Sequence, residues 1–405
     1  MKKIQEKEWG KDVFPLLSWF RAEKVKNARV LVAGAGALGN EALKNLALFG
    51  IGNIVVVDFD KIEYSNLTRS ILFREEDADR GYYKAEIAAK RLKEINPTIK
   101  VQAICGNIAT DVGLGLYRRM DVVLGCLDSL LARILLNRLC FRAGKPWIDG
   151  GIGDLEGQVS AYRMGRCCYE CSLTEEEEKD LEARMSCAGI TRENESFGRV
   201  ATTPVIASII AAVQVQEAMK IIHTEEGCEE VFTPLFEKIF HYEGMHPFTD
   251  VFDFEAYRDE CFSHEYWDNV IEIPKMSADT PVGEALRIIK KTLKTNQVEI
   301  TMRNDKFVDK LASRFDNKKF VPMLPESKIP DYIEASEELH SIAFTEGGLY
   351  LNSYENINDE FPYPKLTLRQ IGIPYWDVLQ VATDKGYAYV ELSADRKHFK
   401  ELFSN

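Results

Sequence analysis

The stretch Arg29-Val-Leu-Val-Ala-Gly34-Ala-Gly36-Ala-Leu-Gly39 decides the fold of this chain of 405 residues. Its apolar first half predicts a short buried strand, and the helical pattern after the glycines extends to about Phe49. In such a strand–turn–helix unit, Gly34 allows a tight turn, Gly36 lets a phosphate approach the backbone and Gly39 lets the helix pack closely. The unpaired N–H groups of the first helical turn then offer a site for an anion.

Strand and helix patterns alternate beyond this unit, as is typical of a doubly wound parallel sheet with helices on both faces. The predicted strands span 53–57, 99–104, 121–125, 146–150 and 157–163, and the predicted helices span 84–95 and 203–222. The second of these helices is the most apolar part of the chain, with Thr203 as N-cap and Pro204 in the first position. Because polar residues such as Gln214 interrupt it, the pattern indicates a buried helix of a soluble protein rather than a membrane span.

Composition and charge narrow the class of protein. Hydrophobic residues make up 45% of the chain and charged residues 28%, which excludes disorder and collagen-like structure. The 51 Lys and Arg residues against 64 Asp and Glu residues give a formal charge of −13, which argues against a nucleic-acid or anionic-membrane binder. Nine cysteines are too few for a disulfide scaffold, and the charged N-terminus does not resemble a signal peptide. We therefore expect a reducing cytoplasm, with the cysteines as free thiols, metal ligands or nucleophiles.

An acidic residue indicates that the anion site is a nucleotide site. Asp58 ends the second predicted strand, 19 residues after Gly39. A carboxylate at that place accepts hydrogen bonds from ribose hydroxyls. The alternative is an ordinary glycine-rich turn, which the strand before it, the helix after it and the acid at this distance disfavour.

Further polar side chains at or near the ends of predicted strands indicate which nucleotide is bound. They are Asp60, Asn66, Arg69, Lys84 and Asp128. The carboxyl ends of parallel strands form the ligand edge of an open sheet, so we expect these side chains to lie together. A dehydrogenase has little use for so many charges. An enzyme that cleaves ATP between its α and β phosphates needs cations such as Arg69 and Lys84 at the phosphates and a carboxylate such as Asp128 for magnesium.

Six motifs carry a resemblance to a known family: Val-Leu-Val-Ala-Gly34-Ala-Gly36-Ala-Leu-Gly39, Val57-Asp58-Phe-Asp60, Ser65-Asn66-Leu67-Thr68-Arg69, Lys84-Ala, Cys126-Leu-Asp128 and Trp147-Ile-Asp-Gly150-Gly151. They resemble the adenylation domain of ubiquitin-activating-type enzymes, the superfamily of the ThiF, MoeB and HesA adenylyltransferases. The resemblance is strong over residues 27–225 and weaker to the end of the chain. It implies that a ubiquitin-like carrier protein binds and that its C-terminal glycine is adenylated. By this match Asp58 would hold the ribose and Asp128 would hold Mg²⁺. Asn66, Arg69 and Lys84 would hold the phosphates.

The chain departs from the family pattern in two respects. The family usually has Arg-Gln where this chain has Arg69-Ser70, and Asp-Asn where it has Asp128-Ser129. Many members also carry an N-terminal arginine that reaches the partner subunit's ATP, whereas the corresponding stretch here, Val13 to Phe20, holds none. Either another cation replaces that arginine, or this subunit does not complete its partner's site.

Two short motifs predict a metal site. Cys168-Tyr-Glu-Cys171 is half a zinc site or a redox pair, and its surroundings lack the strand-to-helix start of a thioredoxin motif. Cys261-Phe-Ser-His264 has the same spacing, and two such pairs make a closed tetrahedral zinc site of three cysteines and one histidine. The resemblance supports this, since related enzymes carry such pairs on either side of the crossover and the long helix. The zinc would be structural and would fasten the irregular crossover, 164–200, to the segment after 230. The alternative is four unconnected residues.

Cys187 is the candidate nucleophile. It lies outside any apolar period in the predicted crossover, with Arg184, Arg192 and Arg199 within a dozen residues. Nearby positive charge lowers the pKa of a thiol and raises the fraction of thiolate. In the resembling family, a cysteine at this Ser-Cys-Ala position forms a thioester or an acyl disulfide with the carrier in some members and does nothing essential in others. Cys187 is therefore a nucleophile or a bystander.

The last part of the chain predicts a second, smaller α/β unit. A helix over 282–294 and strands near 297–302 and 387–392 follow a predicted linker at 274–281. Leu366-Thr-Leu-Arg-Gln-Ile-Gly-Ile373, followed by an alternating strand, resembles the end of a β-grasp unit. In eukaryotic-type activating enzymes a ubiquitin-fold domain sits here and recruits the conjugating enzyme; a generic accessory domain is the alternative. The predicted fold is thus a doubly wound, Rossmann-like adenylation domain over 1–273 with a zinc-clamped crossover, and a β-grasp-like α+β domain over 274–405.

Together these patterns favour an enzyme that uses ATP to adenylate the C-terminus of a ubiquitin-like protein, takes that protein as a thioester on Cys187 and passes it to a conjugating enzyme. The alternatives are a sulfur-carrier adenylyltransferase without an essential thioester step, a non-catalytic scaffold subunit and a dinucleotide-dependent oxidoreductase. The oxidoreductase explains the glycines and Asp58 but gives no purpose to the phosphate cations or the zinc spacing. We expect a homodimer, because family members usually dimerise through the adenylation domain. The expected cofactors are ATP, Mg²⁺ and structural Zn²⁺.

Overall fold

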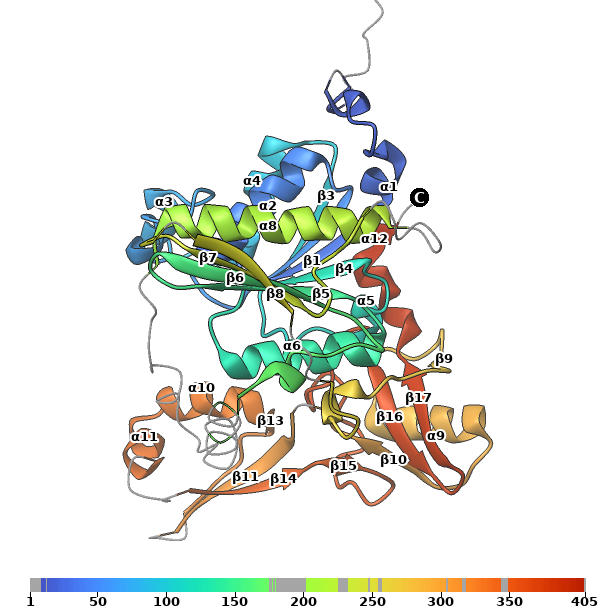
Figure 1. Cartoon of the computed structure of the whole chain (residues 1–405). Coiled ribbons are helices and arrows are strands. Elements are labelled where there is room, and N and C mark those ends of the chain that lie inside the picture. The colour runs from blue at the N-terminus through green and yellow to red at the C-terminus, as the bar shows by residue number, and fades with distance from the viewer. Residues whose placement is uncertain are drawn as a thin grey trace, which may run out of the picture.

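The structure is a computed structural model that describes residues 9–11, 13–174, 177, 179, 202–224, 232–246, 248–253, 257–303, 305–314, 318–343 and 349–403. Its larger unit has three layers, in which helices cover both faces of one sheet (Figure 1). One face carries α2 (Ala37–Phe49), α4 (Lys84–Ile95) and α8 (Pro204–His223), and the other carries α5 (Leu114–Tyr117) and α6 (Leu130–Ala143). The shorter helices of this unit are α1 (Ala22–Asn27) and α3 (Glu75–Asp79).

The sheet of the larger unit has eight strands in the order β3-β2-β1-β4-β5-β6-β7-β8. Strands β3 to β5 of this order run parallel and β5 to β8 pair antiparallel, so the predicted doubly wound sheet is confirmed. The chain moves outward from β1 to β2 and β3 and then returns to β4 on the other side of β1. The crevice between the carboxyl ends of β1 and β4 is therefore the point where open sheets of this kind bind ligands. The strands are β1 (Arg29–Ala33), β2 (Asn53–Val57), β3 (Lys100–Ile104), β4 (Val122–Gly125), β5 (Trp147–Ile152), β6 (Glu156–Tyr162), β7 (Lys238–Glu243) and β8 (Phe248–Asp253).

Alternating side chains of the central strands build a core on each face of the sheet. In β1, Val30 and Val32 pack on the side of α2 and α8, whereas Leu31 and Ala33 pack on the side of α5 and α6. All four side chains are fully buried. A strand that is covered on both faces has an unbroken apolar sequence, and this explains the stretch before the glycines.

Helix α8 lies across the sheet beside α2 (Figure 1). Its predicted start is confirmed, because the Thr203 hydroxyl accepts a hydrogen bond from the Ile206 N–H at 3.3 Å and Pro204 occupies the first turn. By length and composition the helix would be able to cross a membrane, yet half of its most apolar window is buried inside the protein. Packing of this kind is typical of a core helix.

The C-terminal unit contains two smaller sheets (Figure 1). The first has the order β15-β10-β16-β17-β9 and shares its core with α9 (Val282–Leu293). In the second, β12, β13 and β14 each pair with β11, and α10 (Ile329–Glu334) and α11 (Glu337–Ala343) contribute to its core. The sequence analysis predicted elements of the first sheet but not the second sheet. The remaining elements are β9 (Ile271–Glu272), β10 (Val298–Thr301), β11 (Phe307–Ser313), β12 (Lys319–Phe320), β13 (Leu324–Pro325), β14 (Leu349–Tyr354), β15 (Asn356–Ile357), β16 (Val378–Thr383), β17 (Gly386–Glu391) and α12 (Lys400–Phe403).

The predicted linker at 274–281 packs into the core of the C-terminal unit. Met276 and Ala278 are both fully buried there. Strand β9, just before the predicted boundary at residue 273, already pairs with β17. The boundary itself stays a prediction.

Buried polar contacts join the two units at α5. The Trp376 carbonyl accepts a hydrogen bond from the Gly115 N–H at 2.9 Å, and Asp377 Oδ1 accepts one from the Leu114 N–H at 2.8 Å. A Cβ on Gly115 would stand 2.4 Å from the Trp376 carbonyl oxygen, so this close approach requires glycine. The C-terminal unit thus contacts the larger unit directly at the start of α5, through hydrogen bonds and close backbone packing.

Candidate active site

The glycine turn has the geometry that its sequence predicts. Gly34 adopts a φ of +94°, and a Cβ there would stand 2.3 Å from the Cys126 carbonyl oxygen. A Cβ on Gly39 would stand 2.0 Å from the Gly34 carbonyl oxygen, so α2 packs on the turn only because Gly39 has no side chain. A Cβ on Gly36 would meet nothing within 4 Å. The backbone at Gly36 therefore borders open space, where a phosphate is predicted.

Asp58 holds the glycine turn against the end of β2. Its Oδ2 accepts a hydrogen bond from the Ala35 N–H at 2.7 Å, and its Oδ1 accepts one from the Asp60 N–H at 2.8 Å. Burial raises the pKa of the Asp58 carboxyl, while the charge of Lys84 and the two backbone donors oppose this, and the net shift is upward. The residue that is predicted to hold a ribose thus also fixes the turn beneath it.

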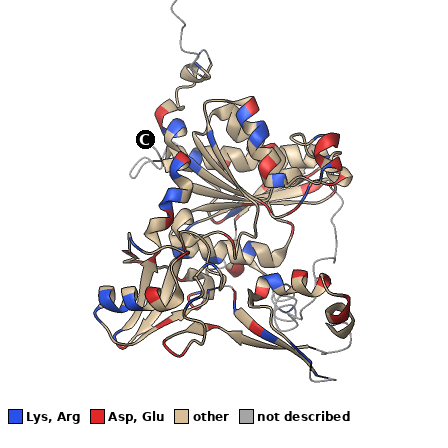
Figure 2. Cartoon of the chain, turned by 180° about the vertical axis from the view of Figure 1, so that it is seen from behind, with Lys and Arg blue, Asp and Glu red and all other residues tan. Residues whose placement is uncertain are grey.

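Lys84 and Asp60 form an ion pair at the same edge. Lys84 Nζ lies 2.6 Å from Asp60 Oδ2, and the Lys84 N–H donates to the Asp60 carbonyl at 2.9 Å. The Lys84 side chain is 11% exposed and that of Asp60 is 51% exposed, so the ammonium is the more buried partner. Acidic and basic residues are interspersed along the coloured ribbon of Figure 2. The Lys84–Asp60 pair shows that both signs of charge also meet at the ligand edge. Because the Lys84 ammonium is already paired with the Asp60 carboxylate, a phosphate that binds Lys84 must either share the ammonium with Asp60 or displace Asp60 from it.

Asn66 and Arg69 lie in the loop between β2 and α4, and both are partly buried. Asn66 Oδ1 accepts a hydrogen bond from the Glu63 N–H at 3.0 Å. Arg69 Nη1 donates to the Ser65 carbonyl at 2.7 Å. The loop that carries both predicted phosphate ligands is therefore held in shape by those same side chains.

Asp128 follows β4 at the crevice between β1 and β4, and it is exposed. The next residue, Ser129, is the N-cap of α6, and its hydroxyl accepts a hydrogen bond from the Ala132 N–H at 3.4 Å. Serine and asparagine are both strong N-caps, which explains why serine suffices at this position. The Asp128 carboxylate thus sits beside a capped helix start at the edge where Mg²⁺ is predicted.

Two buried amides support this edge, and the sequence analysis assigned neither of them to it. Asn40 in α2 is fully buried; its Nδ2 donates to the Ala35 carbonyl at 2.6 Å, and its Oδ1 accepts from the Leu72 N–H at 2.8 Å. Gln214 in α8 is also fully buried, and its Nε2 donates to the Gly125 carbonyl at 2.9 Å. The sequence feature that could have identified Asn40 and Gln214 is a neutral polar residue inside an otherwise apolar helix.

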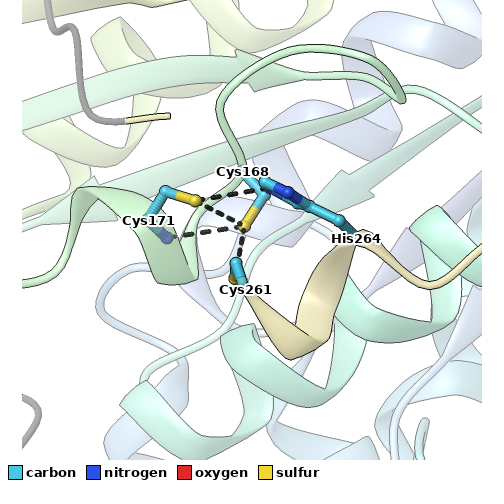
Figure 3. Close-up of side chains that lie close together, drawn as sticks. All are labelled: Cys168, Cys171, Cys261 and His264. Carbon is cyan, nitrogen blue, oxygen red and sulfur yellow. Dashed lines mark hydrogen bonds between the residues drawn. The ribbon is translucent and has the colours of Figure 1, made fainter. Parts of the chain in front are cut away.

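The four predicted zinc ligands lie together, and Figure 3 shows their side chains converging from two segments. The ligand atoms of Cys168, Cys171, Cys261 and His264 all lie within 4.8 Å of one another. Cys168 Sγ is 3.6 Å from the sulfur atoms of both other cysteines. In tetrahedral zinc with Zn–S bonds of ~2.3 Å, two sulfur ligands are about 3.8 Å apart. The cluster therefore has the ligand set and the size of a zinc site.

Aromatic rings hold the histidine of this cluster. The His264 ring stacks on Phe141 and on Tyr257, with ring centroids 5.6 Å and 4.7 Å away and interplanar angles of 20° and 22°. Its Nε2 lies 3.3 Å from Cys171 Sγ. Its Nδ1 is buried and has no hydrogen-bond partner among the described residues. Stacking thus orients the ring so that Nε2 is available to the metal.

Cys187 lies outside the residues that the structure describes, as does most of the predicted crossover beyond residue 174. Three other cysteines are poor nucleophiles. Burial raises the pKa of the Cys140 and Cys126 thiols far above the usual value. Cys105 is exposed, but partial burial and the charge of Glu86 raise its pKa to about 11. A thiolate at neutral pH is therefore disfavoured at these three positions.

Comparisons with known proteins find one family model and several similar proteins. The sequence profile of the ThiF family matches residues 5–262. A sulfur carrier protein adenylyltransferase of Thermus thermophilus is 31% identical over 207 residues, covering 49% of this chain and 71% of that protein. The SUMO-activating enzyme subunit 2 of Dictyostelium discoideum is 38% identical over 151 residues, covering 37% of this chain but only 22% of that protein. The crystal structure of E. coli MccB with ATP is 26% identical, with a TM-score of 0.48 over 60% of this chain and 68% of that chain.

Proposed function

Because this chain belongs to the ThiF family, we propose that it uses ATP to adenylate the C-terminal carboxylate of a ubiquitin-like protein. The observation that carries the proposal is the convergence of three groups at the carboxyl ends of the neighbouring strands β1 and β2. The backbone at Gly36 borders open space, and Asp58 binds the backbone of the turn beside it. The Lys84 ammonium is paired with Asp60, whose backbone N–H donates to Asp58. This is the set of groups that a nucleoside triphosphate needs: a phosphate cradle, a ribose acceptor and a cation.

In the proposed reaction, the carrier's C-terminal carboxylate attacks the α-phosphorus of ATP. The bond from this phosphorus to the bridging oxygen breaks, and pyrophosphate leaves with the electron pair. Arg69 and Lys84 would stabilise the charge that develops on the phosphate oxygens, with Asn66 orienting one of them. Asp128 would hold Mg²⁺, which supplies further positive charge at the departing pyrophosphate. No proton transfer is needed in this step, because the nucleophile is already ionised.

We further propose that Cys187 accepts the activated carrier. Its thiolate would attack the acyl carbon of the carrier adenylate, forming a thioester and releasing AMP. The raised thiol pKa values of Cys105, Cys126 and Cys140 disfavour these three cysteines as alternative nucleophiles. The C-terminal unit, which is docked on α5, would then present a conjugating enzyme to the thioester.

The second candidate function is that of a sulfur-carrier adenylyltransferase, in which adenylation is the only step and Cys187 is dispensable. The relative from Thermus thermophilus favours it, since this chain covers 71% of that protein. The SUMO-activating subunits match at higher identity, but this chain covers less than a third of each of them. The C-terminal unit is the feature that favours the thioester route.

Two assays test these proposals separately. Carrier-dependent exchange of labelled pyrophosphate into ATP reports adenylation, and its absence with every small protein ending in glycine from the same genome would refute the first step. Formation of a carrier adduct that thiols cleave reports the second step. If a Cys187→Ala variant still forms that adduct while retaining exchange, the thioester assignment is wrong and the sulfur-carrier candidate gains.

A further inference from the structure

Helix α6 links the Asp128 turn to the cysteine–histidine cluster. The helix begins at Leu130, two residues after Asp128, and its far end lies against the cluster. There Phe141 stacks on His264, and the Trp267 N–H donates to the Arg142 carbonyl at 3.2 Å. One rigid element thus contacts both the predicted magnesium carboxylate and the predicted zinc ligands.

Arg133, in the first turn of α6, holds the turn that presents Asp128. Its Nη2 donates to the Leu127 carbonyl at 2.8 Å, and its Nε donates to Asp149 Oδ1 at 3.1 Å. The Arg133 side chain is 19% exposed and that of Asp149 is 4% exposed. A buried charge of this kind requires its partner, because an unpaired ion in the interior is strongly destabilising. Arg133 is therefore locked by Asp149 in the orientation that binds the carbonyl next to Asp128.

The loop between the first two zinc ligands reaches back to the same helix. Tyr169 is 9% exposed, and its backbone N–H donates to Asn137 Oδ1 at 3.2 Å. Its phenol is a hydrogen-bonding partner of the Arg133 guanidinium, which also binds Asp149. The next residue, Glu170, receives two hydrogen bonds from Arg138, at 3.1 Å and 2.7 Å.

We propose that the zinc cluster positions Asp128 for Mg²⁺ through Tyr169 and Arg133. The cluster fixes the 168–171 loop, Tyr169 of this loop buttresses Arg133, and Arg133 holds the Leu127 carbonyl and with it the Asp128 turn. Arg133 and Tyr169 are positioning residues, since neither is assigned a contact with a substrate. The proposal rests on the proposed function, in which Asp128 binds the metal. It assigns the zinc a role in Mg²⁺ affinity in addition to fastening the crossover.

The test measures the Mg²⁺ concentration that half-saturates ATP binding, by titration calorimetry without any carrier protein, together with the zinc content of each variant. Loss of a group that orients a metal ligand typically weakens metal affinity about 10-fold to 100-fold, and we expect Arg133→Lys to raise the half-saturating concentration by about 10-fold. Tyr169→Phe removes a single hydrogen-bonding group and should raise it roughly 2-fold to 10-fold. Both variants should keep their zinc.

Arg142→Lys is the matched control. Arg142 lies on the same helix and binds Glu265 of the cluster's other loop at 2.8 Å, but it lies at the end far from Asp128. We expect its Mg²⁺ dependence to equal that of the wild-type protein. Removal of zinc by a chelator should raise the half-saturating concentration in the wild-type protein and add little in Tyr169→Phe, because both changes interrupt the same chain of contacts.

Asp128→Asn separates failure of this proposal from failure of the proposed function. If Asp128→Asn leaves the Mg²⁺ dependence unchanged, Asp128 is not the metal ligand, and both proposals fail at that residue. If Asp128→Asn weakens Mg²⁺ binding while zinc-loaded Arg133→Lys and Tyr169→Phe match the wild-type protein, the metal assignment stands and the coupling to zinc is refuted.

Discussion

Replacing Glu391 by glutamine should loosen the C-terminal unit from the larger unit. Glu391 is fully buried and forms ion pairs with Arg118, Arg119 at 2.6 Å and Arg396 at 3.1 Å, while the Trp376 Nε1–H donates to it at 2.8 Å. Breaking a buried ion pair typically costs ~3–5 kcal/mol because the partner charge stays uncompensated. Arg118 and Arg119, which directly follow α5, have side chains that are 26% and 19% exposed, so water compensates part of their charge when the carboxylate is removed. We therefore expect a loss of about 2–4 kcal/mol.

Glu272→Gln provides the matched control. Glu272 binds two of the same arginines, Arg119 at 2.9 Å and Arg396 at 2.6 Å, but its side chain is 44% exposed. Exposed ion pairs contribute about 0–1 kcal/mol. Hydrogen exchange of the amides of α5 and β17, measured on the native protein, gives the local free energy of opening for both variants. Equal losses in the two variants would refute the view that burial makes Glu391 the anchor.

The stabilisation that Glu391 provides should also depend on pH. Burial alone would raise the pKa of Glu391, but the hydrogen bonds from Arg119 and Trp376 and the charges of Arg119 and Arg118 outweigh it, so the pKa lies below its usual value. A lowered folded-state pKa stabilises the protein above the unfolded-state pKa of ~4.3 and loses this contribution as the pH falls through the folded-state pKa. The difference in the free energy of opening between the wild-type protein and Glu391→Gln should therefore be largest at neutral pH and should decrease only below about pH 4.

Three further predictions follow from the described residues. Gly39→Ala should weaken ATP binding by more than about 10-fold in calorimetry, because its Cβ would stand 2.0 Å from the Gly34 carbonyl oxygen and displace the turn. Gly36→Ala, whose Cβ would meet nothing within 4 Å, should leave the melting temperature of the nucleotide-free protein unchanged. Cys261→Ser should abolish stoichiometric zinc in elemental analysis and lower the melting temperature; a variant that keeps one zinc per chain would contradict the ligand assignment. Cys105 should resist iodoacetamide at pH 8 in mass-spectrometric mapping despite its exposure, because a thiol with a pKa of about 11 is less than about 1% thiolate there. Rapid labelling of Cys105 would show that its surroundings do not hold the thiol protonated.

The glycine turn could be predicted because each glycine answers a local steric demand. The strand before it, the turn and the helix after it are adjacent in sequence, so their packing follows from a few residues. The zinc cluster could be predicted for a similar reason, since each half of it is a spacing of two residues. The two halves lie 93 residues apart in the sequence and meet only in the tertiary structure, and the matching spacings of the two motifs predicted this contact.

The second sheet of the C-terminal unit could not be predicted in the same way. Its strands β12 and β13 have two residues each, which is too short to show a period, and they pair with β11 only through tertiary contacts. Fully buried Asp309 in β11 also breaks the apolar pattern, and its acceptance of a hydrogen bond from the Tyr363 hydroxyl at 2.8 Å is invisible from the sequence. Patterns of this length and polarity favour loops in any sequence-based assignment.

The side chains that the sequence analysis left without a role share one task. Asn40 donates to the Ala35 carbonyl after β1, Gln214 donates to the Gly125 carbonyl of β4, and Arg133 donates to the Leu127 carbonyl after β4. At the carboxyl ends of parallel strands, the chain leaves the ladder and its carbonyls lose their strand partners, and a carbonyl that is shielded from water then needs another donor. The hydrogen bonds to these three carbonyls are buried or partly buried. Donors from the helices that pack on the sheet must therefore replace the missing strand. A lone amide or guanidinium in an apolar helix that packs on a doubly wound sheet thus indicates support for the ligand edge, and this physical demand, rather than contact with a ligand, accounts for all three residues.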